Sequence, residues 1–291
     1  MALDTVASVL SSISGDSDLL NDIRDRAIAT SAIARLKAPT TLTQPVVRGL
    51  SSSRITGVAA AEGATKTTTS GILTAYSYQT LPVAIIVPVS NVLYQSSADL
   101  QKFVIATLTE AISVGIDNEI LRDPNSTFGK SLVASATSAG NTTTTGAYLY
   151  NDMSTAFDQV QSTYYTVNGV IGRRAELGAL RLAVPSGQTM FNPMFTPAHQ
   201  NMPADIFGAQ CEFVDTRALP KTAATAETRF VVGDFSQLEW GTFGGMQIKV
   251  SQDAATSSWN AFTQNLVLVR AEMYIGFTIV NDAAFAIIKE V

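Results

Sequence analysis

The amino-acid sequence predicts an α+β fold in which one long helix lies against strands from both ends of the chain. Three observations lead to this prediction. Apolar residues recur every four positions over residues 97–121, the spacing of an amphipathic helix. Apolar and polar residues alternate over residues 265–280, as in a half-buried strand. Strand-like stretches also flank the turn-prone segment EGATKTTTSG, as in a long hairpin.

Residues 1–53 are expected to form an N-terminal arm. The stretch from Asp18 to Leu36 carries apolar residues at helical spacing, with Asp18 as a candidate N-cap and Pro39 as the stop. The following sequence, APTTLTQPVVRGLSSSR, is polar and extended, and alone it cannot bury enough apolar surface to be ordered. We therefore expect it to lie on another surface, either its own domain or a neighbouring molecule.

Residues 54–80 read as an extended β-hairpin. Arg54–Ala61 and Ile72–Tyr78 are the expected strands, and the Thr-rich segment between them is the tip. A two-stranded hairpin with a polar tip has little core of its own, so it needs a partner surface. Leu81–Val89 then reads as a buried strand.

The helix over residues 97–121 is expected to begin at Ser97 as N-cap and to end before Pro124. Gly115 inside it costs about 1 kcal/mol relative to alanine, which suggests a close packing contact. The opposite face is expected to be in water. The two faces carry, respectively, Leu100, Val104, Leu108, Ile112, Ile116 and Ile120, and Gln101, Thr109, Ser113 and Asp117.

Residues 122–150 are expected to be a mobile loop, because SATSAGNTTTTGAY is of low complexity. A second α/β region follows, and AFAIIKEV closes the chain as a strand after the long strand at 265–280. Early and late strands are expected to share one sheet, with the second region as an inserted subdomain. Its expected helices are Asp152–Tyr164 and Arg174–Leu182, and its expected strands are Gly169–Gly172, Cys211–Val214, Arg229–Val232 and Met246–Val250.

Composition points to extensive contacts with other subunits. Charged residues make up 15% of the 291 residues, against roughly 25% in an average soluble protein. A chain with so few charges hides its surface in a membrane or in subunit contacts. A membrane span is not expected, because the charge-free run between Lys66 and Asp99 is rich in Thr and Ser and is broken by Pro82 and Pro88. The start, MALDTVASVL, is no secretory signal, so synthesis in the cytoplasm is expected.

No catalytic, metal or cofactor site is expected. His199 is the only histidine and Cys211 the only cysteine, which leaves no ligand set for zinc and no intrachain disulfide. Glu110 and Asp117 are carboxylates on the polar face of the long helix, where water is expected to solvate them. The segment GTFGG lacks the Lys-Ser/Thr pair of a phosphate loop. The net charge of −5, without a polybasic run, gives no concentrated patch for gripping nucleic acid.

Four segments in this order resemble the Hong Kong 97-type major capsid proteins of tailed bacteriophages. AAEGATKTTTSGI is similar to the extended loop of that family, with its EGA-x-K core. VPVSNVLYQSSADLQKFVIATLTEAISVGIDNEIL is similar to the strand and long spine helix of its peripheral domain. RFVVGDFSQLEWGTFGGMQIKVSQD is similar to a segment of its axial domain, and NLVLVRAEMYIGFTIVNDAAFAII to its closing segment. Met273–Tyr274 stands where the family usually has Glu-Arg.

The resemblance implies a Hong Kong 97-like capsid fold and a function in the virion. It divides the chain into an N-terminal arm (1–53), an extended loop (54–80), a peripheral domain (81–129 and 256–291, with the spine helix at 97–121) and an axial domain (130–255). The chain is then a shell subunit that assembles with itself, as pentamers and hexamers, into an icosahedral phage head around double-stranded DNA. Further implied partners are a portal protein, a scaffolding protein and DNA bound without sequence preference. Whether a decoration protein also binds the shell is left open.

Residue roles follow from the same resemblance. The extended loop with its root places Arg54, Glu62, Gly63 and Lys66 in assembly contacts. In some relatives a loop lysine attacks an asparagine of a neighbouring subunit while a glutamate removes the amine proton. These three residues fall on Lys66, Asn265 and Glu272. Asn265 and Glu272 face opposite sides of a regular strand, so they could meet one lysine only from different subunits or across a bulge.

Two other functions remain open at this point. An encapsulin-type nanocompartment shell would share the fold but would hold enzyme cargo. A soluble α+β enzyme with an unrecognised site would be a monomer or a small oligomer.

Overall fold

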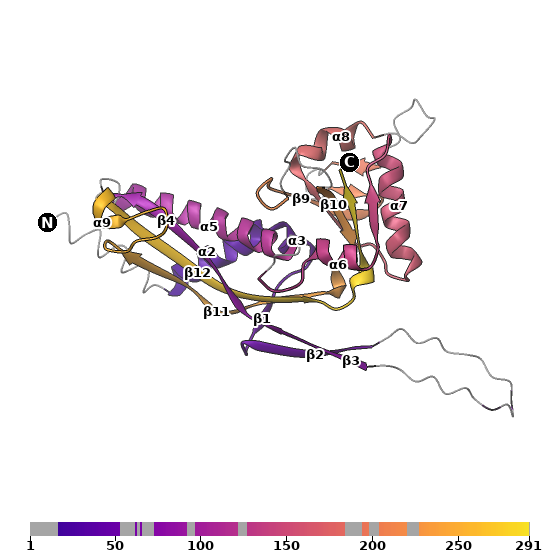
Figure 1. The fold of residues 1–291 in the computed structure, drawn as a ribbon, viewed down its shortest axis with the longest axis horizontal. Helices are drawn as coiled ribbons and strands as arrows, with labels where there is room; N and C mark the ends of the chain where they lie inside the picture. Colours follow the sequence, from indigo (N-terminus) through magenta and orange to yellow (C-terminus); the bar gives the residue numbers. More distant parts are fainter. Residues whose placement is uncertain are drawn as a thin grey trace.

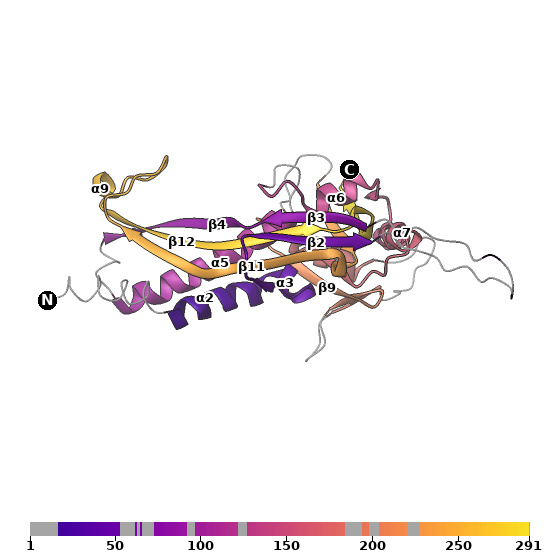
Figure 2. The same ribbon diagram turned by 90° about the horizontal axis from the view of Figure 1, so that it is seen from below.

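The computed structural model describes residues 17–52, 62, 65, 73–91, 97–121, 127–183, 194–197, 204–219 and 227–290. The molecule is elongated, with a four-stranded sheet and its helices at one end and a seven-stranded sheet at the other (Figure 1). A two-stranded hairpin projects from the side (Figures 1 and 2). None of the described helices is long and apolar enough to cross a membrane.

The four-stranded sheet joins early and late parts of the chain, as the sequence predicts. Its order is β1 (Thr40–Leu42), β11 (Leu238–Ser251), β12 (Leu266–Ile279) and β4 (Leu81–Ser90). β12 pairs antiparallel with β11 and β4, while β1 pairs parallel with β11. Because β4 is an edge strand, it can hold Pro82 and Pro88 without losing a central ladder bond. The strand expected at Leu81–Val89 is therefore confirmed, but its burial is partial, since Ile86 is 43% exposed.

The long helix α5 (Ser97–Leu121) packs on one face of this sheet, with the bounds that the sequence predicts. From Leu108 onward its apolar stripe is buried, and so are alternate side chains of β12 that share the same core. Gly115 allows the helix to approach β4, because a Cβ there would lie 2.9 Å from Val83 Cγ1. The buried residues of the two elements are Leu108, Ile112, Ile116 and Ile120, and Val267, Val269, Ala271, Met273 and Ile275.

The polar face of α5 is only partly in water: Glu110 is exposed, as predicted, whereas Ser113 and Asp117 are buried, contrary to the prediction. Ser113 is 4% exposed and Asp117 is 6% exposed. They are covered because the arm packs against α5 as two helices, α2 (Ser17–Thr30) and α3 (Ala32–Leu36). The single helix predicted from Asp18 to Leu36 is therefore wrong. It is interrupted at Ser31, whose backbone is extended, and Asp18 lies inside α2 rather than at its cap.

The arm continues on its own body after α3. The indole Nε1 of Trp240 donates to the Lys37 carbonyl at 2.7 Å, and the Thr40 hydroxyl donates to the Trp240 carbonyl at 3.1 Å. Gly241 lets β1 lie close to β11, since a Cβ there would be 2.3 Å from the Thr40 carbonyl oxygen. Of the two surfaces expected for the arm, its own domain is thus the one that receives residues 27–42.

The seven-stranded sheet forms the second core. α7 (Leu149–Ser162) and α8 (Leu177–Arg181), with the short turn η1 (Arg174–Glu176), pack near it, and η2 (Phe235–Gln237) and η3 (Asp282–Ala284) connect it to the first sheet. Expected helices and strands of this region are confirmed with shifted ends. The strand order is β5 (Thr142–Thr144), β13 (Phe285–Lys289), β10 (Thr228–Gly233), β6 (Gly169–Arg173), β9 (Ala209–Val214), β8 (Asp205–Ile206) and β7 (Phe195–Thr196).

Strand pairing crosses the boundary expected at residue 255. The resemblance places β13 with the spine helix, whereas β13 pairs with β10 and β5 in the seven-stranded sheet. It places β11 in the inserted region, whereas β11 lies between β1 and β12 in the four-stranded sheet. The chain therefore passes from one sheet to the other at the short turns η2, between β10 and β11, and η3, between β12 and β13.

The segment expected to be a loop at residues 122–150 is largely structured where it is described. It contains α6 (Leu132–Ser138) and β5, which pairs parallel with β13. The buried Asn141 side chain donates to the carbonyls of Ala283 and Phe285 at 3.2 and 3.0 Å. These bonds fix the Thr-rich run as an edge strand, so the prediction of a mobile loop is wrong.

Candidate functional site

The hairpin is formed by β2 (Val46–Ser52) and β3 (Leu73–Gln79), which pair antiparallel from Val46↔Gln79 to Ser52↔Leu73. β2 lies within the segment predicted as arm, so the hairpin begins earlier than the sequence analysis places it. The other strand expected there, Arg54–Ala61, lies outside the described residues. Figure 2 shows the hairpin leaving the body next to β12 and running past the second sheet.

One face of the hairpin rests on the body. Tyr78 lies over the sheet, where a Cβ at Gly276 would be 3.1 Å from its ring. Tyr76 covers Gly49 on the opposite strand, an aromatic–glycine pair that compensates for the missing side chain. Burial, and secondly the nearby Glu239 carboxylate, raises the pKa of both tyrosine hydroxyls above the ordinary value. Tyr76 and Tyr78 on this face therefore pack against residues of the same chain.

The other face of the hairpin exposes several apolar side chains. Residues directly opposite in an antiparallel pair share a face, so Val46, Leu50, Leu73 and Ala75 lie on one side, together with the polar residues Arg48, Ser52, Ser77 and Gln79. Leu50 is 68% exposed, Leu73 65% and Val46 45%. A two-stranded hairpin is marginal in water by itself, and such a face indicates a protein contact. We call these four side chains the hairpin face.

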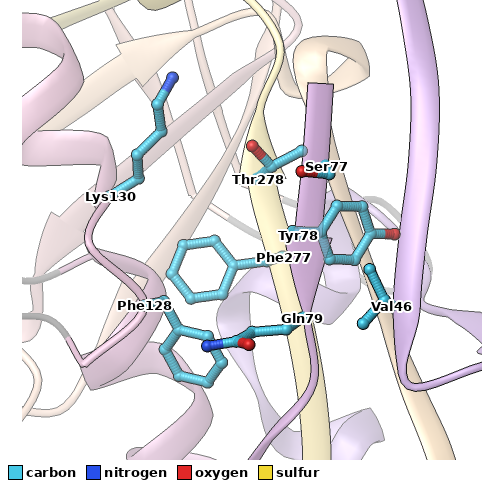
Figure 3. Close-up of a pocket in the computed structure, with 8 residues that line it drawn as sticks. All are labelled: Val46, Ser77, Tyr78, Gln79, Phe128, Lys130, Phe277 and Thr278. Carbon is cyan, nitrogen blue, oxygen red and sulfur yellow. The ribbon is translucent and has the colours of Figure 1, made fainter. Parts of the chain in front are cut away.

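A groove runs between the hairpin root and the connection that leads into α6. Figure 3 shows the Phe128 and Phe277 rings side by side in it, with Val46 and Tyr78 on the hairpin side. The two rings are 4.7 Å apart between centroids. Lys130, the charged residue of the lining, donates to the Ile279 carbonyl at 3.1 Å and pairs with Asp282 at 3.3 Å. The charged side chain of the groove lining is therefore already paired within the subunit.

Most of the predicted loop residues cannot be placed. Arg54, Gly63 and Lys66 lie outside the described residues, and Glu62 is described as an exposed turn residue. Glu272 has Arg270 beside it, at 3.3 Å between Nε and Oε1. Asn265 precedes β12 and ends α9 (Ala261–Gln264) in the left-handed conformation, with φ 53°. Its side-chain oxygen accepts a bond from Asn91 Nδ2 at 2.9 Å.

The structure therefore does not bring Asn265 and Glu272 together within one subunit. They are seven positions apart along an extended chain, which corresponds to roughly 23 Å at about 3.3 Å per residue. A local explanation exists for each residue. Asparagine tolerates the left-handed conformation that ends α9, and the glutamate has a cationic neighbour.

Reactive and metal-binding groups do not cluster in the described part of the chain. There, no group of three or more His, Cys, Asp or Glu side chains could hold a metal ion. Cys211 is 2% exposed, and burial raises the pKa of its thiol. His199 lies outside the described residues.

Sequence reasoning missed two features of the described residues. The first is the connection between β11 and β12, which exposes 44% of Trp259 and 81% of Phe262. The second is a buried ionic cluster in the seven-stranded sheet, where the fully buried Arg173 contacts Glu176, Glu227 and Glu290. An apolar pattern predicts burial of aromatic residues by default, so it gave no signal for the first. Isolated charges in strand-like segments gave none for the second.

Comparisons with known proteins place the chain in a family. The family model described as "Phage capsid family" matches residues 16–289. A solved structure from Microbacterium phage Oxtober96 has a TM-score of 0.67 and 21% identity, and covers 90% of this chain and 91% of that chain. One from Mycobacterium phage Ogopogo has a TM-score of 0.68 and 15% identity, with 90% and 92% covered.

The capsid of a native GTA particle, computed with C5 symmetry, has a TM-score of 0.64 and 15% identity, with 90% of each chain covered. Among curated proteins, no sequence matches the chain. The shared fold with these structures confirms the α+β, Hong Kong 97-like architecture that the sequence predicts.

Proposed function

Because this chain belongs to the phage capsid family and is a capsid shell protein, we propose that it assembles through pentameric and hexameric rings into the icosahedral head of a tailed phage around double-stranded DNA. One observation supports this proposal most directly: the hairpin face is exposed on a projection that the subunit itself does not cover. A second copy is the natural partner, because many weak contacts repeated by symmetry give a stable shell.

The parts of the molecule take the following roles in the proposal. The β2–β3 hairpin and its tip, with Arg54, Glu62, Gly63 and Lys66, form the extended loop that reaches over the adjacent subunit. The seven-stranded sheet and its helices form the axial domain, which surrounds the ring axis. The four-stranded sheet with α5 forms the peripheral domain. This assignment moves β13 to the axial domain and β11 to the peripheral domain, in accord with the strand pairing.

The remaining partners belong to the same proposal. A portal and a scaffolding protein act during assembly in the host cytoplasm. The packaged DNA contacts the shell without sequence-specific recognition. The net charge of −5 supports the last point, since a strongly basic lining would hold the DNA.

The hairpin face provides the test. Leu73→Asp places a charge on the hairpin face, whereas Thr74→Asp places the same charge next to it on the other face, where Thr74 is also exposed. We expect closed shells for the wild type and for Thr74→Asp in negative-stain microscopy and sedimentation, and small oligomers for Leu73→Asp. A wild-type chain that stays monomeric at high concentration would refute the proposed function.

The cross-link between Lys66 and Asn265 of two subunits stays a prediction with its own test. The lysine amine would form a bond to the asparagine side-chain carbon and release ammonia, with Glu272 taking the amine proton. A denaturing gel of assembled shells should then show a ladder of covalent oligomers, which Lys66→Arg abolishes. A single monomer band from wild-type shells would exclude the reaction.

The two other functions give different results. A nanocompartment shell would carry a protein cargo when purified from its host, while a phage head carries nucleic acid. An enzyme would remain a small oligomer under conditions that favour assembly.

A further inference from the structure

One end of the seven-stranded sheet contains a break in the pairing of its strands. β10 and β13 pair in regular antiparallel register as far as Phe230↔Ile288. The next pair is Thr228↔Lys289, so Arg229 is an extra residue on β10 and forms a β-bulge. The bulge lies at the end of the two strands that is remote from the junction with the other sheet, because η2 follows β10 and η3 precedes β13.

Burial of apolar side chains does not decide between this bulged pairing and a regular one. Phe230 and Ile288, the last regular pair, are both fully buried. Beyond them, as far as Glu227 and Glu290, both strands carry polar or charged residues. Hydrophobic burial fixes a register only where apolar residues face the core, so the charged groups are what distinguishes the two pairings here.

A regular pairing would place three cations in one row. On its other side, β10 pairs antiparallel with β6 as far as Phe230↔Gly172. One further regular step in both ladders would set Arg229 opposite Arg173 on β6 and opposite Lys289 on β13. Like charges directly opposite each other destabilise a sheet. The repulsion at Arg173 would be strong, because this side chain is fully buried and salt screens it little.

The bulge removes Arg229 from that row and gives it a carboxylate. Its guanidinium lies over the ring of the next residue, with Cζ 6.0 Å from the Phe230 centroid, whereas neighbours in a regular strand point to opposite faces. Its Nη2 pairs with Glu176 of η1, and its Nη1 donates to the Thr145 hydroxyl at 3.3 Å. The side chains of Arg229 and Glu176 are 12% and 4% exposed, so water weakens their attraction little.

The shifted register also brings carboxylates to Arg173. Its Nη2 donates to Glu290 Oε2 at 3.1 Å, and its Nη1 lies 3.4 Å from Glu227 Oε2. The backbone N–H of Glu290 donates to the Glu227 carbonyl at 2.7 Å, which is the pair that follows Thr228↔Lys289 in the shifted register. Both arginines of the row that a regular pairing would create are thus paired with carboxylates in the bulged one.

We propose that the buried ion pairs of Arg229 and Arg173 are a register lock, which selects the bulged pairing over the regular one and holds the end of β13 in one position. Buried charged groups serve in this way where they fix a register that apolar packing leaves open. The lock belongs to the subunit itself. It bears on any symmetric assembly of the chain, because contacts repeated by symmetry require subunits of one shape.

A double substitution tests the lock in the unassembled subunit. Arg229→Met with Glu176→Gln removes the ion pair of the bulged register and, at the same time, the repulsion of the regular one. In nuclear magnetic resonance spectra we expect a backbone contact between Lys289 and Thr228 in the wild type. In the double variant this contact should be lost and replaced by one between Lys289 and position 229. Retention of the wild-type contact in a folded double variant would overturn the proposal.

The matched control changes the same residue types in an exposed ion pair. Arg217→Met with Glu110→Gln removes a pair whose side chains are 54% and 62% exposed and which lies outside the bulge. This variant should keep the contact between Lys289 and Thr228. Loss of the contact in the control as well would show that the register responds to stability in general, and would also overturn the lock.

A single substitution decides the question if the buried double variant does not fold. Lys289→Glu would set a carboxylate opposite Arg229 in the regular register, so that register becomes attractive. We expect two sets of signals for residues 288–290 of this variant, one for each register. Lys249→Glu, at an exposed position of the other sheet, should give one set. A single set from Lys289→Glu, with position 289 still next to Thr228, would contradict selection of the register by charge.

Discussion

Asp117 of the long helix should be a major determinant of subunit stability, although it lies where the sequence suggests a solvated face. Its carboxylate accepts bonds from the Ser31 hydroxyl at 2.6 Å and from the backbone N–H groups of Ala32 and Ile33 at 3.1 and 3.2 Å. These are the first N–H groups of α3, which have no partner inside that helix. One side chain of α5 therefore caps a helix of the arm.

Asp117→Ala leaves the two backbone N–H groups buried without an acceptor, because Ala32 and Ile33 are 1% and 0% exposed. Each such group costs about 1–3 kcal/mol. Removing the buried carboxylate recovers part of its desolvation cost, so we expect a loss of about 2–4 kcal/mol in the free energy of unfolding. Asp117→Asn should fall between this variant and the wild type. It keeps one acceptor oxygen but turns an amide N–H₂ toward Ala32 N.

Urea denaturation of the unassembled subunit measures this loss, and hydrogen exchange of residues 27–37 locates it. Exposed Asp22 provides a control, since Asp22→Ala removes a surface pair with Arg26 and should cost less than about 1 kcal/mol. If Asp117→Ala were as stable as this control, with the arm still protected from exchange, the capping argument would be refuted.

The pH dependence tests the same site with a defined sign. Burial raises the pKa of the Asp117 carboxyl, and this effect exceeds the opposing effect of its hydrogen bonds and of Arg35. The folded state then holds the proton more tightly than the unfolded state. This residue's contribution should therefore be most favourable below the unfolded pKa, decrease as pH rises to the folded pKa, and stay constant above it. Asp117→Asn should remove that part of the profile.

Three further substitutions address the arm, the second core and a strained residue. Arg173→Met should cost about 1–3 kcal/mol in urea denaturation, because it removes the buried cation that pairs with Glu227 and Glu290, while Glu176 keeps its closer partner Arg229. The exposed Arg217→Met should cost less than about 1 kcal/mol. Gly241→Ala should displace β1 from β11 and lower the free energy of unfolding by about 1–3 kcal/mol, with faster hydrogen exchange in residues 40–42. Unchanged exchange would show that the two strands can accommodate a Cβ atom at this position. Tyr164→Gly should raise the free energy of unfolding by up to about 1 kcal/mol, and with it the melting temperature, since Tyr164 is 78% exposed at φ 67°. A lower melting temperature than that of the wild type would mean that contacts of the tyrosine ring stabilise the fold.

Local patterns predicted the elements that are stabilised by one strong periodicity. α5 covers the residues that its apolar repeat gives, with Ser97 as its first residue rather than its N-cap. β12 forms over the alternating segment, and β13 forms over the apolar run at the end of the chain. The wet face assigned to Asp117 was wrong because the polar side of one helix does not reveal that another helix will end against it. The Thr-rich segment at β5 was misread because threonine favours both loops and strands, and only pairing with β13 decides between them.

The candidate site was predictable in kind but not in position. A hairpin needing a partner follows from its length and polar tip, yet its start at Val46 depends on the cross-strand pair of Gly49 and Tyr76, which no single-strand pattern contains. The exposure of Phe262 could not be predicted either. An aromatic residue in a polar segment looks the same whether it fills a core or is exposed, and only the position of α9 at the end of the body separates these cases.

The arm and the hairpin differ in a way that bears on how a shell could form. The polar groups of the arm between Ser31 and Thr40 are satisfied by Asp117, Trp240 and β11 of the same chain, so releasing this part of the arm to a neighbour would first break bonds already made. Among the described residues, the exposed apolar side chains of the hairpin face have no such bonds to break. Association at this surface therefore gains buried apolar area without a prior unfolding cost, whereas exchange of the arm would have to compensate for one. Subunits of this kind should join through preformed surfaces, with the arm kept as part of the subunit's own core.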